Sequence, residues 1–167
     1  MKKILLLIFT LMIVGLAATF FIRRNPQKGQ IEVAAPEAVA QIAGSSLYLT
    51  QDGTAIEGSY QNLVQIYLSS PSQIAAGQKV SDSAVQKAAK IAALVAKSDF
   101  HAASIRILDS GDLALYDQEE TVVIFAEGKD EEEQVDTLQQ VMARAKMNSG
   151  IIGKIDLRFE KPVITYK

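Results

Sequence analysis

The sequence predicts an α+β protein in which a single N-terminal transmembrane helix is followed by a mixed or antiparallel sheet domain with two main helices. One observation is an uncharged apolar run at residues 4–22, and the other is a series of short β-prone segments separated by two stretches of helical periodicity. With 167 residues, the chain has room for one domain and an appendage. We divide it into a cytoplasmic tip and signal anchor (1–24), a linker (25–45) and an extracytoplasmic sheet domain (46–167).

The apolar run contains 19 consecutive uncharged residues, with Ile4 at its start and Ile22 at its end. As a helix it spans about 28 Å, close to the hydrocarbon thickness of a bilayer. A cleaved signal peptide is the alternative, because the small residues Gly15, Ala17 and Ala18 could supply a cleavage site. The length of the run favours an uncleaved anchor. We therefore predict a single-pass protein of the cell membrane, with its N-terminus in the cytoplasm and its domain outside.

The composition disfavours an enzyme. The chain has no cysteine, which excludes a disulfide framework, a thiolate metal site and a cysteine nucleophile. It has one histidine, His101. Its net charge of −2 lacks the basic excess of a nucleic-acid-binding protein. The acidic run at 127–133 is typical of a solvated helix start, and His101 of a surface or packing residue. We predict no catalytic, metal-binding or cofactor-binding residue and no small-molecule substrate.

The first part of the domain is predicted to be mainly β-structure. Asp52 and Gly53 separate two β-prone runs and indicate a hairpin over residues 46–57. Residues 62–68 form a third strand candidate. Before the hairpin, residues 36–44 have proline at their start and glycine at their end, which favours one short helix in the linker.

The remainder alternates between helices and strands. Apolar residues at three- and four-residue spacing predict helices over residues 81–97 and 131–147. Ser81 or Ser83 can cap the first helix, and Asp130 can start the second. Alternating or continuous apolar residues predict the further strands, which are residues 103–108, 113–116, 121–126, 154–159 and 163–166.

The last predicted strand has the features of a sheet edge. It follows Pro162, which cannot donate a ladder hydrogen bond and therefore favours a strand start or an edge. An edge is either covered by its own domain or used to pair with a partner strand through backbone hydrogen bonds. The residues leave these two alternatives open.

Several short motifs resemble the bacterial cell-division family FtsQ, called DivIB in Gram-positive bacteria. The segment 154–159 (KIDLRF) looks like the Asp-Leu-Arg-aromatic strand of that family, and 122–125 (VVIF) precedes it across a helix. Residues 47–53 (LYLTQDG) are similar to the hairpin that opens the family's β domain, and 77–80 (GQKV) fit as well. The similarity covers roughly residues 46–167, so the resemblance implies an FtsQ/DivIB-like β domain.

The resemblance also implies a function. Members of the family are non-enzymatic scaffolds of the divisome, which bind the coiled-coil proteins FtsB and FtsL along a sheet edge and so help control septal peptidoglycan synthesis. Carried over by position, the partner-binding residues are Arg158, Phe159 and Glu160, followed by the terminal strand Val163, Ile164, Thr165 and Tyr166.

The sequence departs from the family in one respect. Only 21 residues separate Arg24 from Ser46, so the chain looks like an FtsQ without the POTRA domain that family members usually carry. The resemblance therefore does not extend to the recruitment functions assigned to that domain. The alternatives are a bitopic assembly module of a secretion or pilus system, and an exported hydrolase with a cleaved signal peptide.

Overall fold

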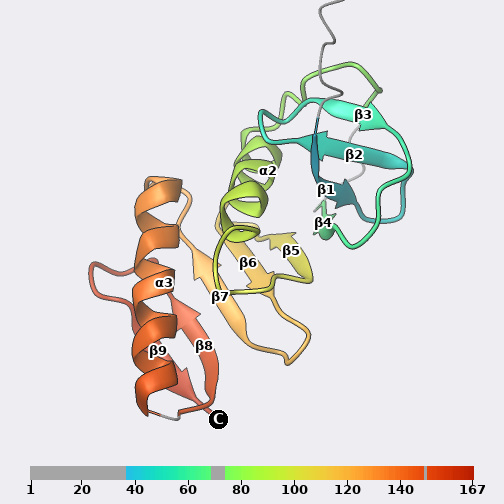
Figure 1. The fold of residues 1–167 in the computed structure, drawn as a ribbon. Coiled ribbons are helices and arrows are strands. Elements are labelled where there is room, and N and C mark those ends of the chain that lie inside the picture. The colour runs from blue at the N-terminus through green and yellow to red at the C-terminus, as the bar shows by residue number, and fades with distance from the viewer. Residues whose placement is uncertain (1–36, 69–73, 149) are drawn as a thin grey trace, which may run out of the picture. The chain divides into compact units, whose positions relative to one another are not determined.

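The computed structural model describes residues 37–68, 74–148 and 150–167. They form a nine-stranded mixed sheet in the order β3-β2-β1-β4-β5-β6-β7-β8-β9, with two helices (Figure 1). The elements in chain order are β1 (Ala38–Ile42), β2 (Leu47–Thr50), β3 (Ala55–Glu57), β4 (Val64–Tyr67), α2 (Ser83–Val95), β5 (Ser104–Ile107), β6 (Leu113–Tyr116), β7 (Val122–Phe125), α3 (Glu131–Asn148), β8 (Ile152–Asp156) and β9 (Val163–Tyr166).

The two helices connect parallel neighbours in the sheet. α2 lies in the chain between β4 and β5, and α3 lies between β7 and β8, and both strand pairs are parallel. Parallel strands that are adjacent in a sheet need such a crossover connection. The pair β1–β4 is also parallel, whereas all other neighbours are antiparallel.

The core lies between the helices and one face of the sheet. From the helices, Ile91 of α2 and Leu138 of α3 are completely buried, and from the sheet Ile66, Ile105 and Leu115 are as well. Every second residue of the central strands therefore faces the helices, as the pleat requires. The intervening residues face the other side of the sheet.

Both predicted helices are confirmed, with one difference at a cap. The N-cap of α2 is Asp82, whose carboxylate accepts the Ala84 N–H at 2.9 Å, rather than Ser81 or Ser83. At α3, the carboxylate of Asp130 accepts the backbone N–H groups of the second and third helical residues at 2.9 and 3.0 Å. Both helices thus begin with an aspartate that satisfies otherwise unpaired donors.

The structure corrects the predicted fold class, which began with a single N-terminal transmembrane helix. In the ranges given above, no helix is both long and apolar enough to cross a membrane. α2 has only 13 residues, and α3 begins with three glutamates. The run from Ile4 to Ile22 lies outside the described residues. The fold class is therefore a nine-stranded mixed sheet with two helices.

The short helix predicted within residues 36–44 is wrong, because Ala38–Ile42 form strand β1. Alternate residues of β1 are buried, and the strand lies between β2 and β4. A helix of this length is only marginally stable in isolation, whereas a central strand has hydrogen-bonding partners on both sides. Pairing within the sheet therefore overrides the helical preference of the alanines.

Two neighbouring substitutions test the orientation of β1. Ala40→Glu places a carboxylate at a fully buried position and is expected to cost about 3 kcal/mol or more of unfolding free energy. Gln41→Glu is the matched control. It keeps the acceptor for Gln65 Nε2 at 2.7 Å but loses the donation of Gln41 to the Ser45 carbonyl at 3.0 Å, so its cost is expected to be about 1 kcal/mol. Chemical denaturation measures both costs, and equal costs would contradict the assigned orientation.

Candidate protein-interaction site

The two edges of the sheet differ in how they are covered. At the β3 edge, the Ala55 N–H donates to the Gln78 carbonyl at 2.9 Å, and the Gly77 N–H donates to the Ala55 carbonyl at 2.7 Å. An isolated bridge between Thr54 and Lys79 extends this cover. At the other edge β9 pairs with β8, and no other described strand lies beside it. The chain therefore protects one edge and leaves β9 accessible within the described part.

The hydrogen bonding of β9 shows which backbone groups point outward. The Lys167 N–H donates to the Ile151 carbonyl at 2.9 Å, so Lys167 points its N–H toward the β8 side. Backbone direction alternates along a strand, so Val163 and Thr165 also direct their N–H groups to β8. The N–H and C=O groups of the intervening residues, Ile164 and Tyr166, consequently point to the open edge.

The side chains of β9 divide between the core and the surface. Ile164 packs against the core, whereas Thr165 is exposed and Val163 is 50% exposed. Tyr166 is 52% exposed, and its ring lies directly over Gly150, where an added Cβ would come within 2.8 Å of a ring carbon. Gly150 therefore provides the space that the Tyr166 ring occupies.

An ion pair fixes the start of the turn between β8 and β9. Asp156 is buried, and its carboxylate accepts hydrogen bonds from Arg158 Nε at 2.9 Å, Nη2 at 2.7 Å and the backbone N–H at 3.2 Å. These bonds, the side-chain ones first, lower the pKa of Asp156 to about 2. The same guanidinium lies 3.6 Å from Asp112 at the end of the β5–β6 turn, so the turn is joined to a second hairpin.

A lysine holds the same turn from the helix side. The Lys129 ammonium donates to the carbonyls of Leu157, at 2.8 Å, and Phe159. The loop that carries Lys129 is fixed in turn by the buried Gln134 of α3, whose Oε1 accepts the Ala126 N–H at 2.7 Å. Two independent contacts thus set the backbone of the turn and hold Phe159 at the surface, where it is 54% exposed.

A cavity of about 410 Å³ lies beside this turn. Leu157, Phe159 and Pro162 contribute apolar surface, while Glu133 of α3 and Glu160 of the turn contribute carboxylates. Lys129, whose ammonium donates to the carbonyls of the turn, also lines the cavity. This combination suits a partner side chain with an apolar body and a basic or polar end.

Exposed apolar side chains gather around β9. Seven large apolar residues of the described ranges are well exposed, and four of them lie on the β8–β9 hairpin or directly before it. These four are Ile151, Phe159, Val163 and Tyr166. Clustered exposed apolar residues mark interaction surfaces, whereas single ones are common on any protein.

The structure brings the predicted partner-binding residues together, but in different roles. Phe159, Glu160, Thr165 and the exposed β9 side chains are accessible, whereas Ile164 packs inward and offers its backbone. Arg158 forms an ion pair with Asp156, so it shapes the turn.

Sequence reasoning missed Lys129, because its contacts join residues 28 and 30 positions apart and no local pattern indicates them. Asp156, two residues before Arg158 on a strand, could have been found as an ion pair.

The described residues contain no group of three or more His, Cys, Asp or Glu that could hold a metal ion. His101 is exposed at its position between α2 and β5.

Among known proteins, no family model matches the chain and no curated protein matches it. The resemblance to FtsQ/DivIB therefore stays a prediction that rests on its short motifs.

The Asp156–Arg158 pair predicts a pH-dependent contribution to stability. The folded-state pKa of Asp156, about 2, lies below its ordinary value of 3.8, so the contribution is fully present above about pH 4 and is lost as the pH falls through 2. Asp156→Asn is expected to cost about 2 kcal/mol at pH 7 and progressively less between pH 4 and 2. Denaturant unfolding across this pH range measures the difference.

Asp109→Asn is the control for this prediction, because Asp109 is exposed in the neighbouring β5–β6 turn. At pH 7 its unfolding free energy should lie within about 0.5 kcal/mol of that of the unmodified protein. A cost of Asp156→Asn that does not change between pH 7 and pH 2 would contradict the assigned role of the ion pair.

Proposed function

We propose that the chain is a non-catalytic scaffold that binds a partner protein by adding a strand of the partner along β9. The observation that supports this proposal is the asymmetry of the sheet edges, because residues 77–80 cover β3 whereas no described strand covers β9. In strand addition, main-chain hydrogen bonds supply affinity and alternate side chains supply specificity. Ile164 and Tyr166 would provide the main-chain groups.

The side chains around this edge support a specific partner. Aromatic residues dominate the binding energy of many interfaces, and Phe159 and Tyr166 are exposed at opposite ends of the segment from the turn to the end of β9. The cavity beside Phe159 would accept a side chain at one end of the bound strand. Val163 and Thr165 would contact the partner from the sheet face between these anchors.

We propose FtsB- and FtsL-like coiled-coil division proteins as the partners. This assignment rests on the resemblance of residues 154–159 to the Asp-Leu-Arg-aromatic strand of FtsQ and DivIB. In that role the chain would be a scaffold of the divisome, and the bound partners would link it to control of septal peptidoglycan synthesis. The partner-binding residues of the resemblance coincide with the uncovered edge, which is the physical reason to prefer them.

Two substitutions at one residue test the main-chain contribution. Tyr166→Ala removes the ring and keeps the outward N–H, whereas Tyr166→Pro removes both. We expect Tyr166→Pro to bind a purified FtsB-like protein of the same organism about two- to tenfold more weakly than Tyr166→Ala, which corresponds to one backbone hydrogen bond. Isothermal titration calorimetry measures the two dissociation constants, and thermal unfolding checks that both variants are folded.

Equal affinity of the two variants would contradict strand addition at β9. Absence of binding by the unmodified chain would instead contradict the choice of partner. A photo-crosslinker at Val163, with a second at the exposed Arg144 of α3 as control, then tests the edge itself. The edge model requires crosslinks to the FtsB-like protein from position 163 and none from position 144.

Phe159 is predicted to be an anchor for the partner. Because the ring is more than half exposed, Phe159→Ala should leave the unfolding free energy within about 0.5 kcal/mol of the unmodified value. The same change should weaken partner binding by at least about 2 kcal/mol, or roughly thirtyfold, if the ring fills a pocket of the partner. An unchanged dissociation constant would remove Phe159 from the binding surface.

A further inference from the structure

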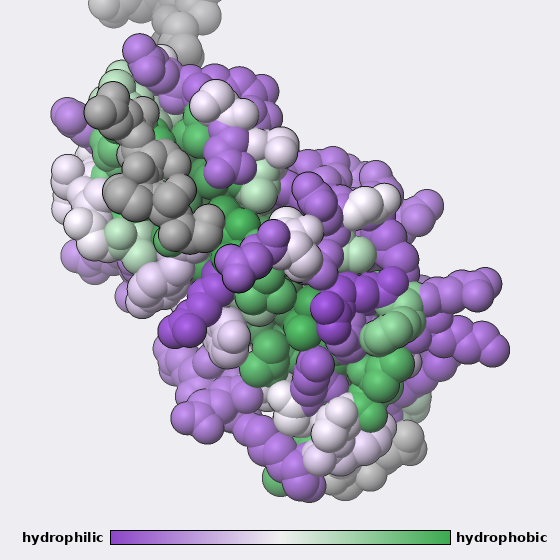
Figure 2. Space-filling view, turned by 180° about the vertical axis from the view of Figure 1, so that it is seen from behind, coloured by the Kyte–Doolittle hydropathy of each residue, from purple (hydrophilic) through white to green (hydrophobic). Residues whose placement is uncertain are grey.

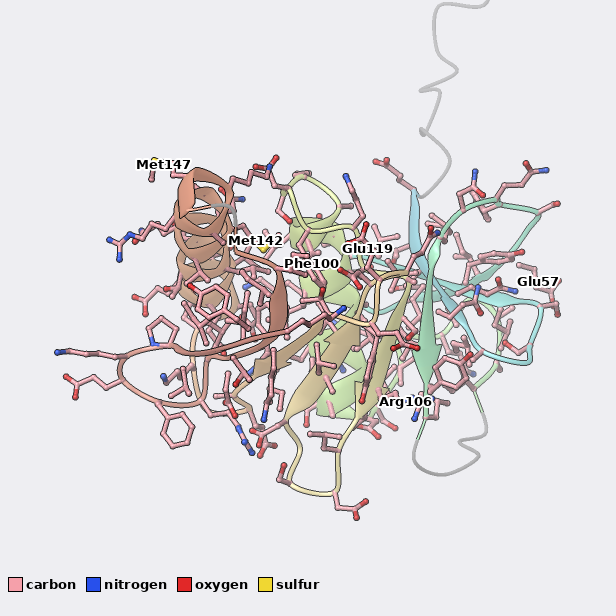
Figure 3. The ribbon with its side chains drawn as sticks, turned by 90° about the horizontal axis from the view of Figure 1, so that it is seen from below. Glu57, Phe100, Arg106, Glu119, Met142 and Met147 are labelled. Carbon is pink, nitrogen blue, oxygen red and sulfur yellow. The ribbon has the colours of Figure 1, made fainter. Side chains whose placement is uncertain are left out.

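A second feature lies on the face of the sheet away from the helices. Arg106 of β5 projects from the sheet on the side opposite to Met142 of α3 (Figure 3). Its guanidinium carbon lies 5.5 Å from the ring centre of Tyr67 in β4 and 5.3 Å from the ring centre of Tyr116 in β6. One cation is therefore held between two aromatic rings from the strands on either side of β5.

The register of the sheet explains this arrangement. Tyr67 is paired directly with Arg106 across the β4–β5 ladder. On the other side Arg106 is paired with Ala114, and Tyr116 lies two residues further along the same face of β6. The small Ala114 leaves room for the guanidinium between the rings, and each ring face attracts the cation.

The guanidinium is otherwise unused within the described residues. Arg106 is exposed, and no hydrogen bond or ion pair to any described residue involves it. An arginine presents five N–H donors around a planar fork that matches the two oxygens of a carboxylate. With a ring on either side, the fork is restrained while no described residue accepts from its donors, so less side-chain entropy is lost when an anion binds.

We propose that Arg106, clamped by Tyr67 and Tyr116, binds the carboxylate of an acidic side chain in a partner polypeptide. This site lies four strands away from β9 and does not depend on strand addition. It assigns the open sheet face to a protein partner that carries an exposed aspartate or glutamate.

The surroundings favour one carboxylate over a polyanion such as nucleic acid. The neighbouring cross-strand pair on this face, Gln65 and Ser104, is uncharged. The next cations, Lys154 and Arg158, are paired with carboxylates: they lie 3.5 and 2.7 Å from Asp156, and Arg158 also lies 3.6 Å from Asp112. Phosphate backbones are bound by groups of cations, whereas a single fork fits a single carboxylate.

The face as a whole fits a protein partner. Seen from behind, hydrophobic residues lie between hydrophilic ones on the surface (Figure 2). The strands on this side contribute Val122 of β7 and Val163 of β9, which are partly or well exposed. A partner held at Arg106 would thus find apolar surface beside the ionic contact, as in interfaces where a polar contact fixes the orientation.

Nuclear magnetic resonance of the full chain labelled with ¹⁵N tests the site through the Nε–H signal of Arg106. The probe is acetyl-triglutamate amide, with acetyl-triglutamine amide and inorganic phosphate as comparison ligands. We expect a saturable shift of the Arg106 signal with triglutamate, and dissociation constants at least about tenfold higher for the other two. Phosphate binding as tight as triglutamate binding would overturn the carboxylate assignment, and so would equal binding of triglutamine.

Two kinds of variant distinguish the contribution of the Arg106 guanidinium from that of the tyrosine rings beside it. Arg106→Gln should raise the dissociation constant of triglutamate about tenfold or more, whereas Arg144→Gln, an equal charge change on the exposed face of α3, should leave it unchanged. Tyr116→Phe keeps the ring and should bind normally, while Tyr116→Leu should bind at least about threefold more weakly because the fork is no longer held.

Binding that is insensitive to Arg106→Gln would overturn the proposal, as would an equal loss in Arg144→Gln. Normal binding by Tyr116→Leu would overturn the role of the clamp. Thermal unfolding of each variant shows whether it is folded, and Tyr67→Leu provides a second test of the clamp from the other, more exposed ring.

Discussion

The packing of both helices against one face of the sheet is the constraint on which the rest of the structure depends. Glu131 at the start of α3 bonds to Lys90 of α2 at 3.0 Å and lies 3.5 Å from Lys87, so the helices also contact each other (Figure 1). The buried side chains of the central strands point to this layer. No described helix covers the opposite face, and no described strand pairs with the outer edge of β9. Both proposed sites lie on these surfaces.

The composition of β9 bears on whether its edge is protected or used. Proteins commonly blunt an edge with charged residues, and here Lys161 and Lys167 flank the strand. Val163–Tyr166 itself carries no charge and exposes Val163 and Tyr166. Covering the β3 edge with residues 77–80 shows that the fold has a means of closing an edge. The uncharged, apolar character of β9 is therefore better explained by a binding strand than by protection alone.

The sequence was informative where the hydrophobic period was strong. The periodicity of α2 and α3, the Asp52-Gly53 hairpin and most later strands correspond to elements of the structure. The strand predicted over 154–159 is partly wrong, because β8 ends at Asp156 and Arg158 and Phe159 lie in the following turn. β1 was mistaken for a helix because its alanines favour one, and only its place between β2 and β4 decides its conformation. Non-local contacts such as Lys129 with the carbonyls of Leu157 and Phe159, or Arg106 with two rings, follow from strand order and have no local signal.

Arg158 and Arg106 are opposite cases of one chemistry. Arg158 donates to Asp156 from its Nε, Nη2 and backbone N–H, and its Nη1 lies 3.6 Å from Asp112, so it is a positioning residue that holds Phe159 in place. Such pre-organisation lowers the entropy lost on binding. The ion pair can therefore strengthen the contact between Phe159 and a partner without touching the partner itself. Arg106 lies between two aromatic rings, and no described residue accepts a hydrogen bond from its guanidinium. The groups around each arginine thus decide its role. Carboxylates occupy the donors of Arg158, which therefore stabilises the fold, whereas aromatic rings beside Arg106 cannot accept from all of its donors, which suits the proposed binding of a carboxylate.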